Sequence, residues 1–340
     1  MNKKISTMMI VLLIVSILTG CSDSGANTVS KSGFYFDTVI TITLYDTENE
    51  TYINDCFELA EKYENMFSNT IDTSDISKIN ANAGQNAVTV SDETIEIIEK
   101  SIYYSKLSDG SLDITIGKLS DLWNFSEIAK NIDNDENETE ASVIPPEDDI
   151  IQALDTVDYT GITISGNDVM LQNPNTKLDL GAIAKGYIAD QMKEYLNSKN
   201  VKSGIINLGG NVLTIGKKND NSDYTVGIQK PFDEQGSTIA KLKISDKSVV
   251  TSGIDQRFYK VDGKIYHHIL DTKTGYPVEN DLLSVTIISD SSCDGDALST
   301  TCYSLGKEKG MELIENLDNV EAVFITDKYE IIKSSGAEIE

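Results

Sequence analysis

The order of helical and strand-forming patterns constrains this chain more than any other feature. Apolar side chains recur at helical spacing over 51–68 and 91–107, and again over 181–197. Between residues 203 and 288, short β-branched runs follow one another with turn residues between them. Because strands and helices do not alternate regularly, a doubly wound parallel sheet is disfavoured. We expect an α+β fold with mixed or antiparallel sheets and packed helices.

Local sequence patterns also indicate where the shorter helices and strands begin and end. Within 203–288, strands are expected at 203–207, 212–215, 224–229, 239–244, 249–251, 257–261, 266–270 and 283–288. Further strands are expected at 34–45, 161–164, 169–172, 178–180, 322–325 and 331–333, and further helices at 148–157, 296–305 and 307–317. The segment 127–149 is acidic and nearly free of aromatic residues, which predicts a mobile surface insertion.

The first residues have the composition of an export signal. Lys3 and Lys4 precede an apolar run over 8–18, which is too short to span a bilayer comfortably. The run ends in Leu-Thr-Gly before Cys21, which is typical of a lipoprotein cleavage site. An ordinary signal peptide followed by a cysteine is the alternative. We expect a signal peptide over 1–20, a lipid-anchored linker over 21–33 and one domain over 34–340.

Charge and cysteine content narrow the possible partners. The formal net charge is −27, and removal of residues 1–20, which contain two lysines and no acid, makes it −29. Such a surface repels nucleic acid, so we expect no nucleic-acid partner.

Three cysteines, Cys56, Cys293 and Cys302, would remain beside Cys21, and this odd number argues against a disulfide framework. A Cys293–Cys302 bridge and buried free thiols are both compatible with the sequence.

Segment 177–190 combines features of a phosphate site. It begins with a short expected strand, turns at Gly181 and continues as a helix that carries Lys185 in its first turn. Free N–H groups at a helix start, together with a nearby ammonium, attract anions. A P-loop is excluded because its spacing of glycine, lysine and hydroxyl residues is absent. Tight packing of the helix on a sheet through its small residues explains the segment equally well.

The C-terminal third carries groups that could bind a metal. Asp296 and Thr300 lie four residues apart, so on a helix they share one face. Their oxygens are the hard ligands that Mg²⁺ prefers. His267 and His268 are the only histidines, and the lack of further histidines or cysteine pairs disfavours zinc. Taken alone, a helix cap is the commoner role for Asp296.

Two further segments have the composition of turns. The stretch 109–117 contains two carboxylates and three glycine or serine residues, and Trp123 follows it. By itself it favours a turn into a strand, with Trp123 in the core. The stretch 207–211 places two glycines between two asparagines, which is first a turn and second a backbone loop that could border a ligand.

Taken in order, these four segments resemble the ApbE family, the FAD:protein FMN transferases. The resemblance runs from Phe34 to Leu317 through LDITIGKLSDLWNF, LDLGAIAKGYIAD, INLGGNV, HHILDTKTGYPV and DGDALSTT. It implies an ApbE-like architecture and an enzyme that binds FAD and Mg²⁺. Such an enzyme transfers FMN to a threonine hydroxyl of an extracytoplasmic redox protein and releases AMP. Several family members are lipoproteins, which agrees with Cys21 and with a location on the outer face of the cell membrane.

The resemblance also implies roles for individual residues. Asp296 and Thr300 match metal ligands, and Ala182 matches a position that offers its backbone carbonyl. His268 matches the histidine of an H-x-x-D-P segment and is our candidate for taking the proton of the acceptor threonine. Thr272 stands where that segment has proline, which puts only the local turn in doubt. The positions that match flavin contacts are Phe36, Ser111, Leu112, Asp113, Asp179, Lys185 and Leu270.

Two other functions are compatible with the same motifs. An FAD pyrophosphatase would use the same metal site, with water in place of the threonine, and would release FMN and AMP. A non-catalytic flavin-binding lipoprotein would hold the flavin without releasing AMP. The pair formed by Asp296 and Thr300 argues mildly against the non-catalytic lipoprotein, because flavin binding alone needs no metal.

Overall fold

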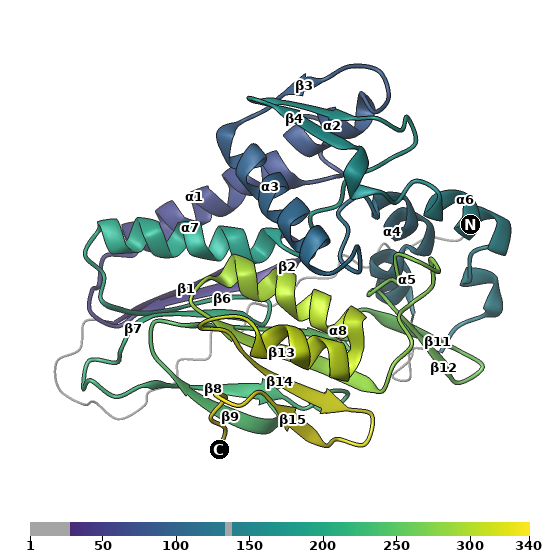
Figure 1. Ribbon diagram of the computed structural model, residues 1–340. Helices are drawn as coiled ribbons and strands as arrows, with labels where there is room; N and C mark the ends of the chain where they lie inside the picture. The colour runs from purple at the N-terminus through teal and green to yellow at the C-terminus, as the bar shows by residue number, and fades with distance from the viewer. Residues whose placement is uncertain (1–27, 133–137) are drawn as a thin grey trace, which may run out of the picture.

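A computed structural model describes residues 28–132 and 138–340 and confirms the α+β class, with antiparallel sheets. Its centre is an eight-stranded sheet in which every neighbouring pair is antiparallel (Figure 1). In spatial order the strands are β1 (Val29–Tyr35), β2 (Thr38–Leu44), β6 (Ser203–Leu208), β7 (Asn211–Gly216), β10 (Ser248–Gly253), β13 (Leu282–Ser289), β14 (Glu321–Thr326) and β15 (Ile331–Lys333). All eight residues of β13 are buried, so this strand lies between two covered faces.

Helices cover one face of the sheet. They are α1 (Glu50–Phe67), α7 (Ala184–Ser198) and α8 (Ser292–Glu315). Helix α8 packs on β10 and β13, and α7 lies beside it over β6 and β7 (Figure 1). The other face is covered at β10, β13 and β14 by a hairpin of β8 (Tyr224–Gln229) and β9 (Thr238–Ile244). The core is therefore layered, with helices above the sheet and a hairpin below it.

Two smaller groups of elements stand beside the sheet. The first contains α2 (Asp75–Ala81), α3 (Asp92–Leu107) and a small sheet of β3 (Val88–Thr89), β5 (Asp168–Leu171) and β4 (Ile162–Ser165). The second contains α4 (Gly117–Trp123), α5 (Phe125–Asn131), η1 (Ala141–Val143), α6 (Glu147–Leu154), η2 (Tyr159–Gly161) and the hairpin of β11 (Phe258–Val261) and β12 (Lys264–His267). Trp123 lies in the core of the second group, stacked on Phe125, and its Nε1 donates to the carbonyl of Gly275. The prediction of a core tryptophan is confirmed.

Most expected helices and strands are present within one to three residues. Ser91 caps α3, because its side chain accepts a hydrogen bond from the amide of Thr94. The expected helices over 296–305 and 307–317 are the two arms of α8, which bends at Gly306 where φ is 77°. Helix α8 begins at Ser292, four residues earlier than expected. Cys56, Cys293 and Cys302 are buried free thiols, so the structure contains no Cys293–Cys302 bridge.

The expected strand at 34–45 is instead a hairpin. Tyr35 pairs with Thr38, and the two residues between them, Phe36 and Asp37, have φ values of 53° and 56°. The first strand begins at Val29, within the segment expected to be a linker. Serine hydroxyls of β1 pair with threonine hydroxyls of β2, which gives this polar stretch a partner.

Other expectations were wrong for tertiary reasons. Residues 178–180 form no strand, although Lys177 makes an isolated parallel bridge with Ile116. Helix α7 begins at Ala184 because 181–183 form a turn, and β12 ends at His267 instead of residue 270. The stretch after 109 enters α4 and not a strand. Helices α2, α4 and α5 were not expected, since each has only seven residues.

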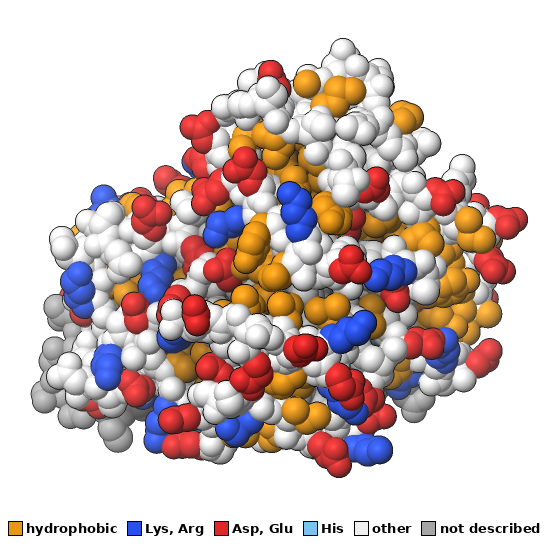
Figure 2. All heavy atoms as spheres, in the orientation of Figure 1, with side chains coloured by type: hydrophobic (Ala, Val, Ile, Leu, Met, Phe, Trp, Pro, Cys, Tyr) orange, Lys and Arg blue, Asp and Glu red, His pale blue; other side chains and the backbone are white. Residues whose placement is uncertain are grey.

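The N-terminal signal, the lipidation residue Cys21 and residues 133–137 of the acidic insertion lie outside the described residues. The described part of that insertion contains most of α5, all of η1 and the first turn of α6, so it is partly helical. Within the described ranges, no helix combines the length and the apolar character needed to cross a bilayer. Acidic side chains are spread over the face seen in Figure 2, with lysines between them, and do not gather in one patch.

Candidate active site between helices α7 and α8

The site is built where the start of α8 meets the side of α7. Asp190 on α7 accepts hydrogen bonds from the backbone amides of Ser292 and Cys293, at 2.8 and 2.9 Å. It also accepts one from the hydroxyl of Ser291, at 2.7 Å. Burial raises the pKa of Asp190, although these three donors oppose the rise. The carboxylate of α7 thereby supplies the acceptors that the first amides of α8 lack.

A glycine lets the two helices touch at this point. A Cβ on Gly186 would lie 2.2 Å from the carbonyl oxygen of Ser292, which is far inside van der Waals contact. Only glycine can therefore occupy this position while α8 stays where it is. Gly186 of the 177–190 motif thus serves packing, but against helix α8, whereas the packing interpretation of this motif expected a sheet.

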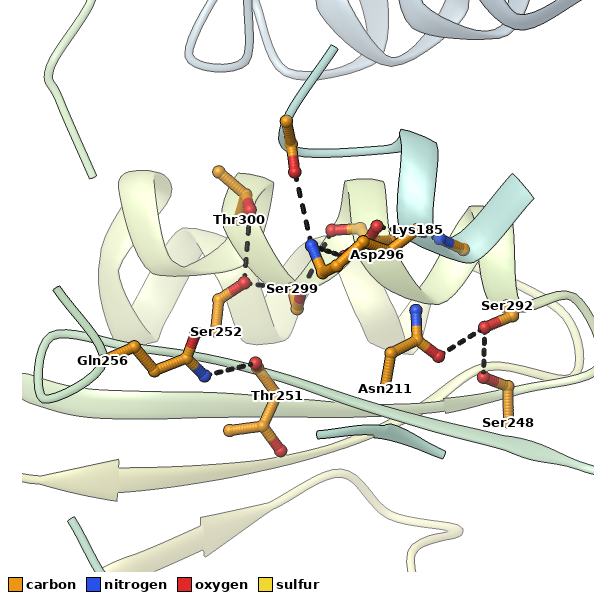
Figure 3. A network of polar contacts seen from close by, with 12 residues as sticks. Lys185, Asn211, Ser248, Thr251, Ser252, Gln256, Ser292, Asp296, Ser299 and Thr300 are labelled. Atoms are coloured by element: carbon orange, nitrogen blue, oxygen red, sulfur yellow. Dashed lines mark hydrogen bonds and ion pairs between the residues drawn. The ribbon is translucent and has the colours of Figure 1, made fainter. Parts of the chain in front are cut away.

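Close contact of the helices brings Asp296 onto the start of α7. Its side chain is 5% exposed, and the amide of Gly186 donates to its Oδ2 at 2.9 Å. The ammonium of Lys185 lies 3.4 Å from Oδ1 of Asp296 and 3.3 Å from the carbonyl oxygen of Gly181 (Figure 3). The turn at 181 and the carboxylate at 296 are therefore joined through one positive charge.

Hydroxyl groups extend the site along α8. Thr300 lies one turn after Asp296, and its Oγ1 is 3.2 Å from the hydroxyl of Ser252 on β10. The hydroxyl of Ser252 also lies 2.8 Å from that of Ser299, which in turn donates to the carbonyl of Asp296 at 2.9 Å (Figure 3). The predicted ligand pair thus faces the sheet through a connected set of hydroxyls.

The oxygens at this place fit a hard cation. A carboxylate, a carbonyl and the ammonium of Lys185 already meet there, so the oxygen donors surround a positive charge. In the described ranges, no three His, Cys, Asp or Glu side chains gather closely enough to hold a metal. An ion would be completed by neutral oxygens and by substrate, which is the usual environment of Mg²⁺. Ala182 lies in the same turn as Gly181 and is half-buried.

His268 contacts Arg257 and has a lowered pKa, which favours a neutral imidazole at neutral pH. Burial, the positive charge of Arg257 and the neighbouring His267 lower its pKa, and Lys185 contributes in the same direction. Nδ1 of His268 donates to the carbonyl of Arg257 at 3.3 Å, and its backbone amide donates to the same oxygen at 3.1 Å. This bond fixes the proton on Nδ1 and leaves Nε2 with a free lone pair.

His267 has a separate, structural role. It is 4% exposed, and its Nε2 donates to the carbonyl of Val278 at 3.0 Å. Nδ1 of its ring accepts a hydrogen bond from the amide of Ile269 at 3.3 Å. Both ring nitrogens are therefore used within the protein.

Several predicted flavin contacts use their side chains for local structure. Both carboxylate oxygens of Asp113 accept hydrogen bonds, from Thr115 and from the amide of Tyr159. Oδ1 of Asp179 accepts the amide of Gly181 at 2.8 Å and closes the turn before α7. Leu112 is buried in the main core. The two carboxylates therefore hold backbone groups in place, while Leu112 fills the core. Of the four carboxylate oxygens, only the second oxygen of Asp179 has no hydrogen-bond donor among the described residues.

Three predicted contacts lie outside the contact between α7 and α8. Phe36 occupies the β1–β2 turn in a left-handed conformation that a bulky residue rarely adopts. Leu270 is buried in the core around Trp123. Ser111 borders a cavity of about 300 Å³ that Asp271 and Ser304 also line. Ser304 lies one turn beyond Thr300, so this cavity continues the row of hydroxyls on α8. A second cavity, of about 410 Å³, lies at the far end of β7 and contains no predicted site residue.

A comparison with protein families decides the family of the chain. The family model of the ApbE family matches residues 36–324. The chain belongs to the ApbE family. An FAD:protein FMN transferase of Klebsiella pneumoniae is 36% identical over 90% of this chain and 92% of that protein. One from Treponema pallidum is 29% identical over 95% of this chain and 92% of its own length.

Solved ApbE structures have the same fold. The flavin transferase ApbE of Vibrio cholerae superposes with a TM-score of 0.80 at 26% identity, covering 92% of this chain and 98% of that one. The ApbE protein of Thermotoga maritima also gives a TM-score of 0.80, at 29% identity over 91% of this chain and 97% of its own. The expected ApbE-like architecture is thereby confirmed.

Sequence reasoning missed four residues of the candidate site and its surroundings. Asp190 and Gly186 lie within the motif that was singled out, but their contacts with α8 depend on helix packing. Ser252 had a visible signal, since a serine and a glycine lie between the strands expected at 249–251 and 257–261. Arg257 is the only arginine of the chain, and that count could have drawn attention to it.

Proposed function

We propose that this chain transfers the FMN half of FAD to a threonine hydroxyl of a protein outside the cytoplasm and releases AMP, in the presence of Mg²⁺. The observation that carries the proposal is the meeting of Lys185 and Gly181 with Asp296. Two motifs that are 111 residues apart in the chain supply one anionic, one cationic and several neutral groups at this place. Such a set suits the charged diphosphate of a dinucleotide.

The reaction exchanges one phosphorus–oxygen bond for another. The threonine oxygen forms a bond to the phosphorus of the FMN half, and the bond from that phosphorus to the bridging oxygen breaks. The electron pair of the broken bond leaves with AMP, and the threonine proton passes to Nε2 of His268. His268 suits this task because its Nδ1–H is held by the Arg257 carbonyl, which directs the basic nitrogen away from the backbone.

The remaining groups bind and orient FAD. Lys185 contributes a positive charge to the diphosphate, and the backbone of the 181–183 turn approaches it closely. Asp296 and Thr300, with the carbonyl of Ala182, would hold Mg²⁺. When bound, the ion would neutralise charge that develops on the departing phosphate. Phe36, Ser111, Leu112, Asp113, Asp179 and Leu270 would surround the flavin through side chains and backbone.

The protein would act at the outer face of the cell membrane. Cleavage before Cys21 would leave that residue at the N-terminus, where lipid chains hold the domain on the bilayer. The acceptor would then be an extracytoplasmic redox protein that carries an accessible threonine. The strongly acidic composition agrees with this location, because it favours a soluble body that stays clear of anionic headgroups.

Intact-mass measurement tests the proposal directly. The purified protein is incubated with FAD, Mg²⁺ and a candidate acceptor, and the acceptor is expected to gain the mass of FMN less water on a threonine. EDTA should stop the gain, and added Mg²⁺ should restore it. Release of FMN and AMP with no mass gain on any acceptor would show a pyrophosphatase instead. Bound flavin with no AMP would show a binding protein.

A further inference from the structure

Arg257 contacts His268 through its backbone, while its side chain has no hydrogen-bond or ion-pair partner in the described part of the chain. It is the only arginine in the chain, and it follows β10, the strand whose Ser252 contacts Thr300. Its side chain is exposed, and among the described residues it forms no ion pair and no side-chain hydrogen bond. An arginine whose guanidinium has no carboxylate partner is available to an anionic ligand.

The backbone of Arg257 is fixed to His268. The amide and the Nδ1 of His268 both donate to the Arg257 carbonyl. The guanidinium is close enough to lower the pKa of the imidazole, and so is the ammonium of Lys185. Three basic groups from three segments therefore lie close enough to interact electrostatically, and one of them, Lys185, also contacts Asp296.

The order of these groups suggests which of them would serve the entering side of the phosphorus and which the leaving side. In an in-line displacement the entering oxygen and the leaving group lie on opposite sides of phosphorus. His268 marks the entering side, while Asp296 and Lys185 mark the side of the departing phosphate. The phosphoryl oxygens that face His268 would then lack a positive partner. An arginine fork matches phosphate oxygens in both geometry and charge.

We propose that Arg257 is a further substrate-contacting residue, whose guanidinium binds the phosphoryl group that is transferred. The inference rests on the proposed function, because it assigns a role within the same site. It differs from that function in naming a residue that contacts the FMN phosphate on the acceptor side. Binding of FMN alone should therefore depend on Arg257, whether or not an acceptor is present.

The test compares Arg257→Gln, Arg257→Lys and a matched control, Lys241→Gln. Lys241 is an exposed lysine on β9, on the face of the sheet opposite to the site. Affinity for FMN and for riboflavin is measured by flavin fluorescence. Arg257→Gln should weaken FMN binding about tenfold or more and leave riboflavin binding unchanged, because riboflavin has no phosphate. Arg257→Lys should recover part of the loss, and Lys241→Gln should change neither affinity.

Kinetic measurements distinguish a role of Arg257 in binding the phosphoryl group from a role in recognising the acceptor. If Arg257 binds the phosphoryl group, Arg257→Gln slows both transfer to an acceptor and the slow hydrolysis of FAD by water, each by about 10²-fold. Unchanged hydrolysis with a raised KM for the acceptor would overturn the proposal and assign Arg257 to acceptor recognition. Unchanged FMN affinity would overturn it as well. Failure of the wild type to transfer FMN would refute the proposed function, while the FMN binding test on Arg257 would still be decisive.

Discussion

The backbone amide of Gly186 on α7 donates a 2.9 Å hydrogen bond to Oδ2 of Asp296 on α8. This bond ties the buried carboxylate to the turn that carries Gly181 and Ala182. The other oxygen of Asp296 faces the ammonium of Lys185. One oxygen is therefore used for position, and the other is available to a cation.

Replacement of Asp296 should separate metal binding from folding. Asp296→Asn keeps an oxygen for the Gly186 amide but removes the charge, so Mn²⁺ binding, followed by electron paramagnetic resonance, should fall strongly. Transfer should fall about 10²-fold or more. The thermal midpoint should change little, because Lys185 is 31% exposed and its ammonium can regain water when the carboxylate is replaced. An unchanged transfer rate would remove Asp296 from the metal site.

Contact between the helices at Gly186 should make that position intolerant of any side chain. Gly186→Ala would place a methyl group 2.2 Å from the Ser292 carbonyl oxygen, and we expect the free energy of unfolding to fall by about 1–3 kcal/mol. Asp296 would shift with α8, so the KM for FAD should also rise. Urea denaturation measures the first effect and initial rates the second.

Gly161 provides the control for this substitution. A Cβ there would meet no atom within 4 Å. Gly161→Ala should change the free energy of unfolding by less than about 1 kcal/mol. Equal losses for the two variants would mean that the α7–α8 contact is looser than described.

The sequence predicted those structural features whose cause lies within a few neighbouring residues. Ser91 caps α3 through a bond to Thr94, three residues away, and the helix began where the sequence placed it. Asp296 and Thr300 share a helix face through spacing alone. In contrast, the β1–β2 turn consists of Phe36 and Asp37. Asparagine–glycine pairs usually mark such a turn, so the sequence contained no signal for it.

The contacts that complete the site come from tertiary packing. Nothing near Asp190 in sequence indicates that it would meet the first amides of α8, about a hundred residues later. The side chains of Asp113 and Asp179 accept hydrogen bonds from their own turns, and the family resemblance did not indicate this use of the two carboxylates. Roles that involve a bound ligand stay predictions until a ligand is measured.

His267 should make the protein less stable in mild acid. Burial lowers the pKa of His267 from 6.5 to about 4. Between these values the unfolded chain binds a proton that the folded chain does not, so stability falls as the pH decreases through this window. At 1.36 kcal/mol per pKa unit, the loss is about 3 kcal/mol. Protonation would also break the bond from the Ile269 amide to Nδ1.

His267→Gln should remove that part of the acid sensitivity. The free energy of unfolding of the wild type and the variant is measured in urea at about pH 7 and about pH 4. The wild type should lose about 3 kcal/mol more than the variant over this interval, since other titrating groups are common to both. Parallel losses would show that His267 accepts a proton in the folded state.

The variant His268→Gln should retain FAD and lose transfer. Glutamine can still donate to the Arg257 carbonyl but cannot accept a proton, so the rate should fall by about 10²- to 10⁴-fold. Because its pKa is lowered, His268 stays neutral at neutral pH, and the wild-type rate should not fall between about pH 7.5 and about pH 6.5. A steep decrease in that interval would assign the proton transfer to another group.

Thiol counting tests the lipid anchor and the cysteines together. Burial raises the pKa of Cys56 to about 12 and also raises the pKa of Cys293 and Cys302, so none should react with a thiol reagent in the folded protein. The chain has four cysteines, and a lipid on the sulfur of Cys21 would leave three thiols after unfolding. Cys21→Ser should also give three thiols but should leave the membrane fraction. Four thiols in wild-type protein from membranes would contradict lipidation, because an unmodified Cys21 reacts like the others.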